Sequence, residues 1–216
     1  MQPSLTAPWL IADLLHPRSI LSFAPHNPGF TTARHILMRE VRDADLTPEL
    51  DAGAWLAGQM QGIGHGDSVG LMTSRSLHHF QHRTVGPVQC LATVGLGNAE
   101  RVGHRRGHQP ASYGTINLVV LIDRGLTQSA MIEAMTIVAE ARTLAVISAR
   151  IALPQGLATG TGTDCIALAC DPGQTAFAGL HTELGEAIGC AVHDAVLAGA
   201  QAWVKVHGPV PSAQVG

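Results

Sequence analysis

The sequence has little charge and no strong excess of either sign. Charged residues make up 13% of its 216 residues, and the formal net charge is -3. A chain without a basic footprint is a poor candidate for binding nucleic acid. No apolar run reaches spanning length, and the first residues lack the basic start and long apolar core of a secretory signal. We therefore expect a cytoplasmic chain with neither a nucleic-acid nor a membrane partner.

The signatures of several well-known sites are also missing. The chain contains no Gly-Xaa-Ser-Xaa-Gly elbow, no His-Glu-Xaa-Xaa-His motif and no Walker lysine. Its cysteines have apolar neighbours and no CxxC spacing, so we interpret all four as reduced core thiols: Cys90, Cys165, Cys170 and Cys190. No familiar catalytic motif therefore identifies the chemistry.

What is present is an alternation of short β-rich runs and longer helical patterns, with no linker long enough to divide them. This predicts a single α+β domain over residues 1–216, with its core at about 19–200, a mixed sheet covered by helices and a frayed tail at 205–216. Strands are expected at 19–24, 35–41, 68–72, 88–94, 115–122 and 164–170, the first two as a hairpin or neighbours. Helices are expected to start at the caps Thr47, Thr127 and Thr182 and to end near Met60, Ser148 and Ala198.

Two segments of the chain resemble each other. GTINLVVLID (114–123) and GTDCIALACD (162–171) both begin with Gly-Thr, continue as an apolar strand, end in Asp and precede a helix. They could be a duplicated β–α unit. The alternative is that any two buried strands introduced by Gly-Thr look alike.

The loop before the second of these strands is the most informative stretch, ATGTGTDCIALAC (158–170). Gly160 and Gly162 allow positive φ and a close approach of a ligand to the backbone, and Asp164 is the only charge before the apolar run. Loops of this kind often hold ligands in α/β sheets. One alternative is a phosphate-binding loop like that of tubulin-like proteins, which would make the chain a nucleotide-binding protein.

Four segments together resemble the adenosylcobinamide amidohydrolase family: ATVGLGNAERVGH (92–104), GTINLVVLID, ATGTGTDCIALAC and AGLHTELGEAIG (178–189). LSFAPHNPGF is similar to the family's Ser-Xaa-Pro-Xaa-Asn-Gly-Gly stretch, although Pro28 replaces its first glycine. The resemblance extends from about Leu21 to about Val196.

The resemblance implies a corrinoid-salvage enzyme. Such an enzyme hydrolyses the amide between the aminopropanol arm and the corrin ring of adenosylcobinamide, giving adenosylcobyric acid and aminopropanol or its phosphate. It implies a corrinoid partner and no separate cofactor, because cobalt enters with the substrate. A homo-oligomer is possible, and a non-catalytic corrinoid carrier remains an alternative.

The catalytic candidates follow from the needs of amide hydrolysis: an activated nucleophile, donors for the oxyanion and an acid for the leaving amine. Asp164 could act as general base on water or orient a histidine, and His181 could protonate the amine. Glu183, and Glu186 beside it, lie in the first turn of a helix, where the dipole favours their ionised form. The alternatives are a turn-forming Asp164, a capping His181 and glutamates that only complement the dipole.

The amide arms of a corrin need hydrogen-bond donors and acceptors, so we predict that a set of polar and glycine residues binds the substrate. Asx-turns explain the asparagines of this set almost as well. Its two strand-initiating threonines could be nucleophiles only beside a base. The set is Asn27, Asn98, Thr115, Asn117, Gly160, Thr161, Gly162, Thr163 and Glu186.

Histidines are concentrated in the first half of the chain, nine of the twelve before residue 109. His78, His79 and His82 have helical spacing, and His104 and His108 lie in a polar loop. No carboxylate or cysteine stands at ligand spacing to them, so surface histidines are favoured over a metal site and we assign no metal.

Overall fold

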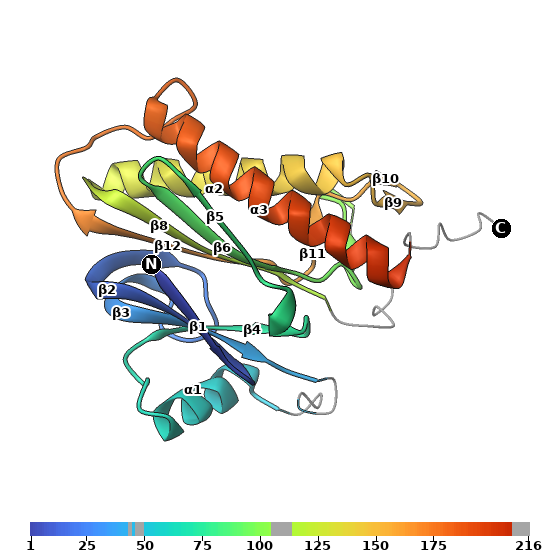
Figure 1. The fold of residues 1–216 in the computed structure, drawn as a ribbon, viewed down its shortest axis with the longest axis horizontal. Coiled ribbons are helices and arrows are strands. Elements are labelled where there is room, and N and C mark those ends of the chain that lie inside the picture. The colour runs from blue at the N-terminus through green and yellow to red at the C-terminus, as the bar shows by residue number, and fades with distance from the viewer. Residues whose placement is uncertain (43–44, 46–49, 105–113, 209–216) are drawn as a thin grey trace.

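The computed structural model describes residues 1–42, 45, 50–104 and 114–208 (Figure 1). In this part of the chain a mixed sheet of eight strands has the order β4-β3-β2-β12-β8-β6-β5, with β1 paired to β2. Its strands are β1 (Gln2–Thr6), β2 (Trp9–Ser22), β3 (Gly29–Glu40), β4 (Val69–Thr73), β5 (Gln81–Val85), β6 (Val88–Val94), β8 (Ile116–Leu126) and β12 (Cys165–Pro172). The helices are α1 (Ala52–Gly62), η2 (Leu77–His79, a 3-10 turn), α2 (Gln128–Ser148) and α3 (Glu183–His207).

Two short pairs of strands complete the structure beside the large sheet. Strand β7 (Ala99–Glu100) pairs with β11 (Gly160–Thr161), and β9 (Ala152–Leu153) pairs with β10 (Gly156–Leu157), both antiparallel. The first pair joins the loop after β6 to the Gly-rich loop before β12. The region expected to be plain loop at 153–163 therefore contains short strands.

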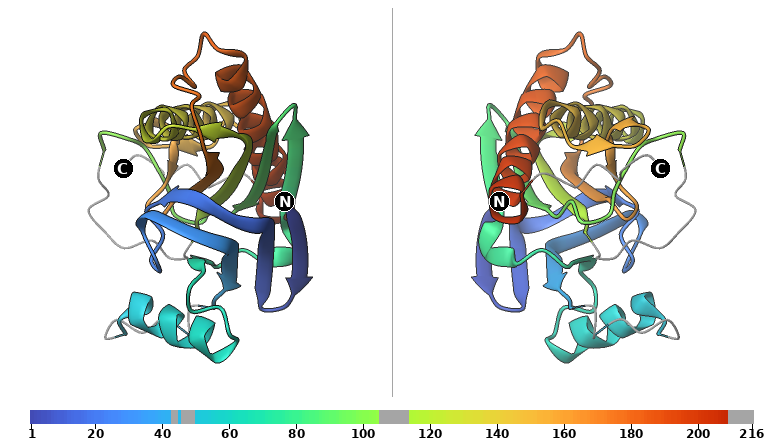
Figure 2. Two further views of the ribbon diagram at one scale, coloured as in Figure 1. Left: turned by 90° about the vertical axis from the view of Figure 1, so that its left-hand side faces the viewer. Right: turned by 90° about the vertical axis from the view of Figure 1, so that its right-hand side faces the viewer.

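The sheet is curled, so that its two halves cover each other. Figures 1 and 2 show α2 and α3 side by side over the β12-β8-β6-β5 half, with the β1–β4 half under its other face and α1 outermost. Alternate side chains of the central strands enter the two resulting cores. On β8, Leu118 and Val120 face the helices, whereas Val119 packs with Leu10 and Ile36 of the N-terminal half. Burial on both faces explains why the central strands are continuously apolar.

The helix starts follow the predicted caps where those residues are described. Thr127 accepts a hydrogen bond from the backbone N–H of Ala130, and Thr182 accepts one from Gly185. The end of α3 was predicted too early, because the helix runs to His207 instead of Ala198. The first helix was also misplaced: it is capped by Asp51, while Thr47 and Pro48 lie outside the described residues.

The N-terminal region contributes more to the core than the sequence indicated. β1 and the first half of β2 precede the expected start at residue 19, and Leu10, Ala12 and Leu14 are fully buried. Prolines at 3, 8 and 17 interrupt the strand pattern, which hid these elements. The irregularity between Asp13 and Arg18 in the β2–β3 pairing breaks the period-2 alternation further.

The predicted β–α repeat is present. β8 and β12 are parallel neighbours, and their pairing places Asn117 opposite Cys165, the same residue offset as in the aligned motifs. Each strand leads into a long helix, and α2 packs against α3. The internal similarity of the sequence thus corresponds to two adjacent, equivalent units of the fold.

Helix α3 is long and apolar enough by composition to cross a membrane, the one described helix of which this is true. Its buried residues, among them Leu184, Ile188 and Val192, belong to the core under α2 and α3. A core helix passes the same composition test, so α3 is weak evidence for a membrane span.

Candidate substrate cavity at the start of the paired strands

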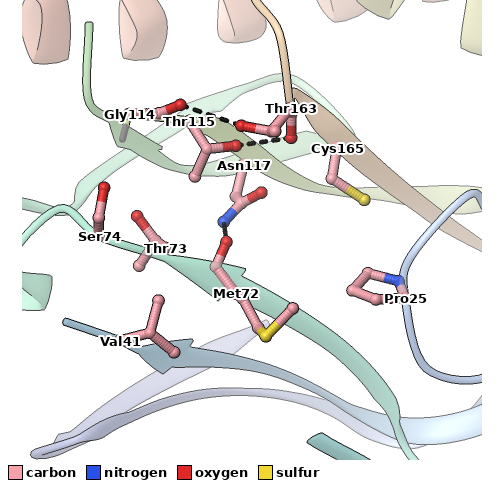
Figure 3. Close-up of a pocket in the computed structure, with 10 residues that line it drawn as sticks. All are labelled: Pro25, Val41, Met72, Thr73, Ser74, Gly114, Thr115, Asn117, Thr163 and Cys165. Carbon is pink, nitrogen blue, oxygen red and sulfur yellow. Dashed lines mark hydrogen bonds between the residues drawn. The ribbon is translucent and has the colours of Figure 1, made fainter. Parts of the chain in front are cut away.

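A cavity of about 270 Å³ lies where β8 and β12 begin and β4 ends (Figure 3). The curl of the sheet brings the end of β4 close to the start of β8. The Asn117 side-chain N–H on β8 donates to the Met72 carbonyl on β4 at 2.6 Å, and the cavity lies beside this contact. The described residues that line it come from five segments: Pro25, Val41, Met72, Thr73, Ser74, Gly114, Thr115, Asn117, Thr163 and Cys165. Open α/β sheets bind ligands at the carboxyl ends of their strands, but here the cavity is at the amino ends of the parallel pair.

Thr115 and Thr163 hold the starts of the two strands together. The Thr115 hydroxyl donates to the Thr163 carbonyl at 2.7 Å, and the Thr163 hydroxyl donates to the Gly114 carbonyl at 3.0 Å. Both hydroxyl protons are therefore used by backbone carbonyls. Neither hydroxyl meets a basic side chain among the described hydrogen bonds, so the arrangement favours a structural role over a nucleophilic one.

Two of the predicted amide side chains are buried with an unused acceptor. Asn117 and Asn98 are 1% and 4% exposed, and the Oδ1 atom of each lacks a hydrogen-bond partner among the described residues. The Nδ2 atom of Asn98 makes one long contact, to the Thr163 hydroxyl oxygen at 3.5 Å. Buried polar atoms are nearly always paired, so an unpaired one beside a cavity suggests a place for a ligand's donor.

Asn27, by contrast, serves the fold. It has a φ of 52°, and its side-chain N–H group donates to the carbonyls of Gly66 and Ser68 at 3.2 and 2.9 Å. This is the turn-forming role that the sequence left open as the alternative to substrate binding.

Thr73 supplies a donor at the same cavity. Its hydroxyl oxygen accepts the backbone N–H of Arg75 at 3.0 Å, which leaves its own proton available. The Thr73 hydroxyl and the Asn117 Oδ1 atom thus offer one donor and one acceptor. An amide presents the complementary pair, a carbonyl acceptor and an N–H donor.

Asp164 lies at the end of the Gly-rich loop, directly before β12, with its side chain 6% exposed. Its carboxylate accepts from Arg142 at 2.8 Å, from the backbone N–H groups of Thr161 and Ile116 at 3.0 Å each, and from the Thr161 hydroxyl. Four donors occupy the roughly four lone-pair positions of a carboxylate. Burial raises the pKa of Asp164, and Arg142 and the other donors oppose that rise.

These bonds make Asp164 a latch between the loop, β8 and α2 rather than a free general base. Gly160 is required beside it, since a Cβ there would lie 2.5 Å from the Asp164 carboxylate. Gly162 is exposed and unconstrained. The Thr161 N–H already binds this carboxylate, which disfavours the phosphate-cradle interpretation of the TGTGT loop.

His181, Glu183 and Glu186 are exposed. They lie at the start of α3, which the chain reaches after leaving the carboxyl end of β12 (Figure 1). An eight-residue strand spans roughly 26 Å, so the structure does not bring Asp164 and His181 together. Both motifs flank the same strand, one before it and one after it. The two glutamates lie in the first turn of α3, where they complement its dipole.

A buried arginine, Arg18, lies at the carboxyl ends of β8 and β12 and was not predicted from the sequence. The Arg18 side chain, 4% exposed, contacts Asp123 at 3.2 Å and Asp171 at 2.7 Å. These aspartates end the two repeated motifs, and their repetition was the available signal. Gly125 and Gly173 follow them with backbones in direct contact, so a Cβ on Gly173 would lie 2.4 Å from Gly125.

The histidine spacing did not indicate a helix. His78 and His79 lie in η2, whereas His82 lies in β5, and His108 is outside the described residues. Within the described ranges, no group of three or more His, Cys, Asp or Glu side chains could hold a metal ion.

Cys165 was interpreted as a core thiol but also lines the cavity. Burial raises its pKa to about 12, so the side chain is a neutral thiol at physiological pH. The apolar lining of the cavity could not be found from the sequence, because the curl of the sheet brings distant segments together.

Comparison with known proteins points to one family. The family model described as adenosylcobinamide amidohydrolase matches residues 2–208. A protein of Halobacterium salinarum named adenosylcobinamide amidohydrolase is 33% identical over 140 residues. That alignment covers 61% of this chain and 58% of the length of the relative.

Proposed function

The chain belongs to the adenosylcobinamide amidohydrolase family, and we propose that it hydrolyses the amide between the aminopropanol arm and the corrin ring of adenosylcobinamide. The products are adenosylcobyric acid and aminopropanol. The single observation that carries the assignment of the site is the unused acceptor of Asn117, which lies with the Thr73 hydroxyl on a cavity of suitable size.

The size of the cavity suggests how the substrate binds. Pockets that enclose a drug-sized ligand usually measure about 300–1,000 Å³, so about 270 Å³ suits a short arm and not a macrocycle. The corrin ring then stays at the surface. We assign contacts with its amide arms to the exposed Gly162 and Thr163 of the Gly-rich loop.

In the reaction a water oxygen adds to the amide carbonyl carbon, the C–N bond breaks and the leaving amine takes up a proton. The Thr73 hydroxyl donates to the carbonyl oxygen as negative charge develops there. The Asn117 Oδ1 atom accepts the amide N–H and fixes the plane of the amide. The Asp164 latch and the bonds between Thr115 and Thr163 hold these groups in place.

The test is to incubate the purified protein with adenosylcobinamide, with and without a chelator, and to assay adenosylcobyric acid by chromatography and mass spectrometry. We expect product in both samples, because the proposal includes no resident metal and cobalt enters with the substrate. Loss of product on chelation would contradict that part of the proposal. A corrinoid spectrum that shows binding without product would indicate a carrier instead of an enzyme.

A further inference from the structure

The cavity has two chemically different sides. Gly114, Thr115 and Thr163 lie on one side in Figure 3, and Pro25, Val41 and Met72 lie on the other, with Asn117 between them. The side beyond Asn117 therefore offers mainly carbon and sulfur atoms from Pro25, Val41 and Met72, with the Thr73 and Ser74 hydroxyls at one edge and the Cys165 thiol at the other.

Among the described residues that line the cavity, no side chain carries a charge. The thiol of Cys165 is protonated, since burial raises its pKa to about 12. A small apolar wall without charged groups favours a neutral aliphatic group and gains affinity from each methyl or methylene that it covers.

The topology of the substrate decides which half of the amide can enter. The acyl half continues into the corrin ring, which is too large for a cavity of about 270 Å³. The amine half ends after three carbons. With the amide held at Asn117 and Thr73, the short amine half fits within the cavity and the acyl half extends from it to the ring.

From this geometry, and resting on the proposed function, we infer that the wall of Val41, Met72 and Cys165 binds the branching methyl of the leaving amine. The enzyme consequently selects amides of 1-amino-2-propanol over amides of ethanolamine, which lack that methyl. The enzyme thus distinguishes substrates by their leaving amine, and this selection is separate from its recognition of the corrin ring.

The test compares adenosylcobinamide with its ethanolamine-linked counterpart as substrates of the wild-type protein. One methyl in an apolar pocket changes specificity by about 10-fold to 200-fold, so we expect kcat/KM to be at least about 10-fold higher for adenosylcobinamide. Equal values, or a preference for the ethanolamine amide, would overturn the inference while leaving the proposed function intact.

A matched pair of variants on β12 assigns the selectivity to the wall. Cys165→Ala removes a wall atom, and Cys170→Ala makes the same change further along the strand in the helix-facing core. We expect the ratio of the two kcat/KM values to fall several-fold in Cys165→Ala and to stay at the wild-type value in Cys170→Ala. An unchanged ratio in Cys165→Ala, with thermal unfolding confirming the fold of both variants, would contradict the assignment.

If neither corrinoid is hydrolysed, the proposed function fails and binding decides the inference separately. N-acetyl-1-amino-2-propanol and N-acetylethanolamine present the two amine halves on a minimal amide. Calorimetric titration should then show tighter binding of the first, and weaker or equal binding of it would overturn the inference.

Discussion

At each end of the paired strands β8 and β12 the two strands carry equivalent residues, but the amino ends and the carboxyl ends differ in chemistry. At the amino ends the repeated threonines bond to each other's strands, and a cavity with an unused amide acceptor lies beside them. At the carboxyl ends the repeated aspartates are both bound by one buried arginine, Arg18. The first end has a cavity with an unused hydrogen-bond acceptor, whereas the side chains that mark the second end are engaged in ion pairs.

This difference shows that a repeated sequence motif does not by itself determine which end of the strands binds a ligand. Gly-Thr and Asp recur at both units, yet the site depends on what the curled N-terminal half places against each end. β4 brings Thr73 to the amino ends, whereas β2 brings Arg18 to the carboxyl ends.

The largest expected effect is on activity at the amino ends. Asn117→Ala removes the acceptor for the scissile amide, and we expect kcat/KM for adenosylcobinamide to fall by about 100-fold, the usual result of losing an oriented hydrogen-bonding group. His181→Ala at the other end should stay within about twofold of wild type. A large loss of kcat/KM in His181→Ala, with little change in Asn117→Ala, would place the active site at the carboxyl ends instead.

The next effect is on stability at the carboxyl ends. Gly173→Ala places a Cβ 2.4 Å from the Gly125 backbone, and we expect unfolding free energy to drop by more than about 3 kcal/mol. Gly189→Ala in α3 meets no atom within 4 Å and should stabilise by up to about 1 kcal/mol. Denaturant unfolding measures both, and a neutral Gly173→Ala would show that the strands can separate there.

A smaller loss of stability is expected when the arginine clamp is removed. Arg18→Met keeps the buried stem but removes the guanidinium from Asp123 and Asp171, and Asp171 keeps its contact with His16 at 2.9 Å. Breaking a fully buried pair costs about 3–5 kcal/mol. Because these aspartates are 66% and 40% exposed, we expect about 2 kcal/mol with kcat/KM unchanged. A selective loss of activity in a stable Arg18→Met protein would move the site toward the carboxyl ends.

The smallest effect is a difference in thiol reactivity. The pKa of Cys165 is raised to about 12 by burial. Cys190 is exposed on α3, so its interpretation as a core thiol is wrong. At pH 8 iodoacetamide should therefore modify Cys190 first and leave Cys165 unmodified in the folded protein. Mass spectrometry of the digested protein distinguishes the two, and early labelling of Cys165 would mean that its thiol is ionised and accessible.

The sequence predicted the parts of the fold that local patterns determine. The caps Thr127 and Thr182, the strand β6 and the equivalence of β8 and β12 all follow from neighbouring residues. The curl of the sheet does not, because it depends on contacts between β4 and β8 that no local pattern records.

The same limit explains the mixed outcome at the site. Asn117 and Thr163 were identified because they stand in recognisable motifs, whereas Thr73 and Val41 belong to strand ends with no motif. Asp164 and His181 were both proposed because they stand in motifs of the resemblance, although a strand of eight residues separates their surroundings.

Hydrogen–deuterium exchange with bound adenosylcobinamide tests the location of the site most directly, with Thr73→Ala used to slow turnover. We predict slower exchange in peptides covering 114–117 and 158–165, and no change in peptides covering 178–186. Protection confined to 178–186 would contradict the account and place the substrate at the carboxyl ends of the paired strands.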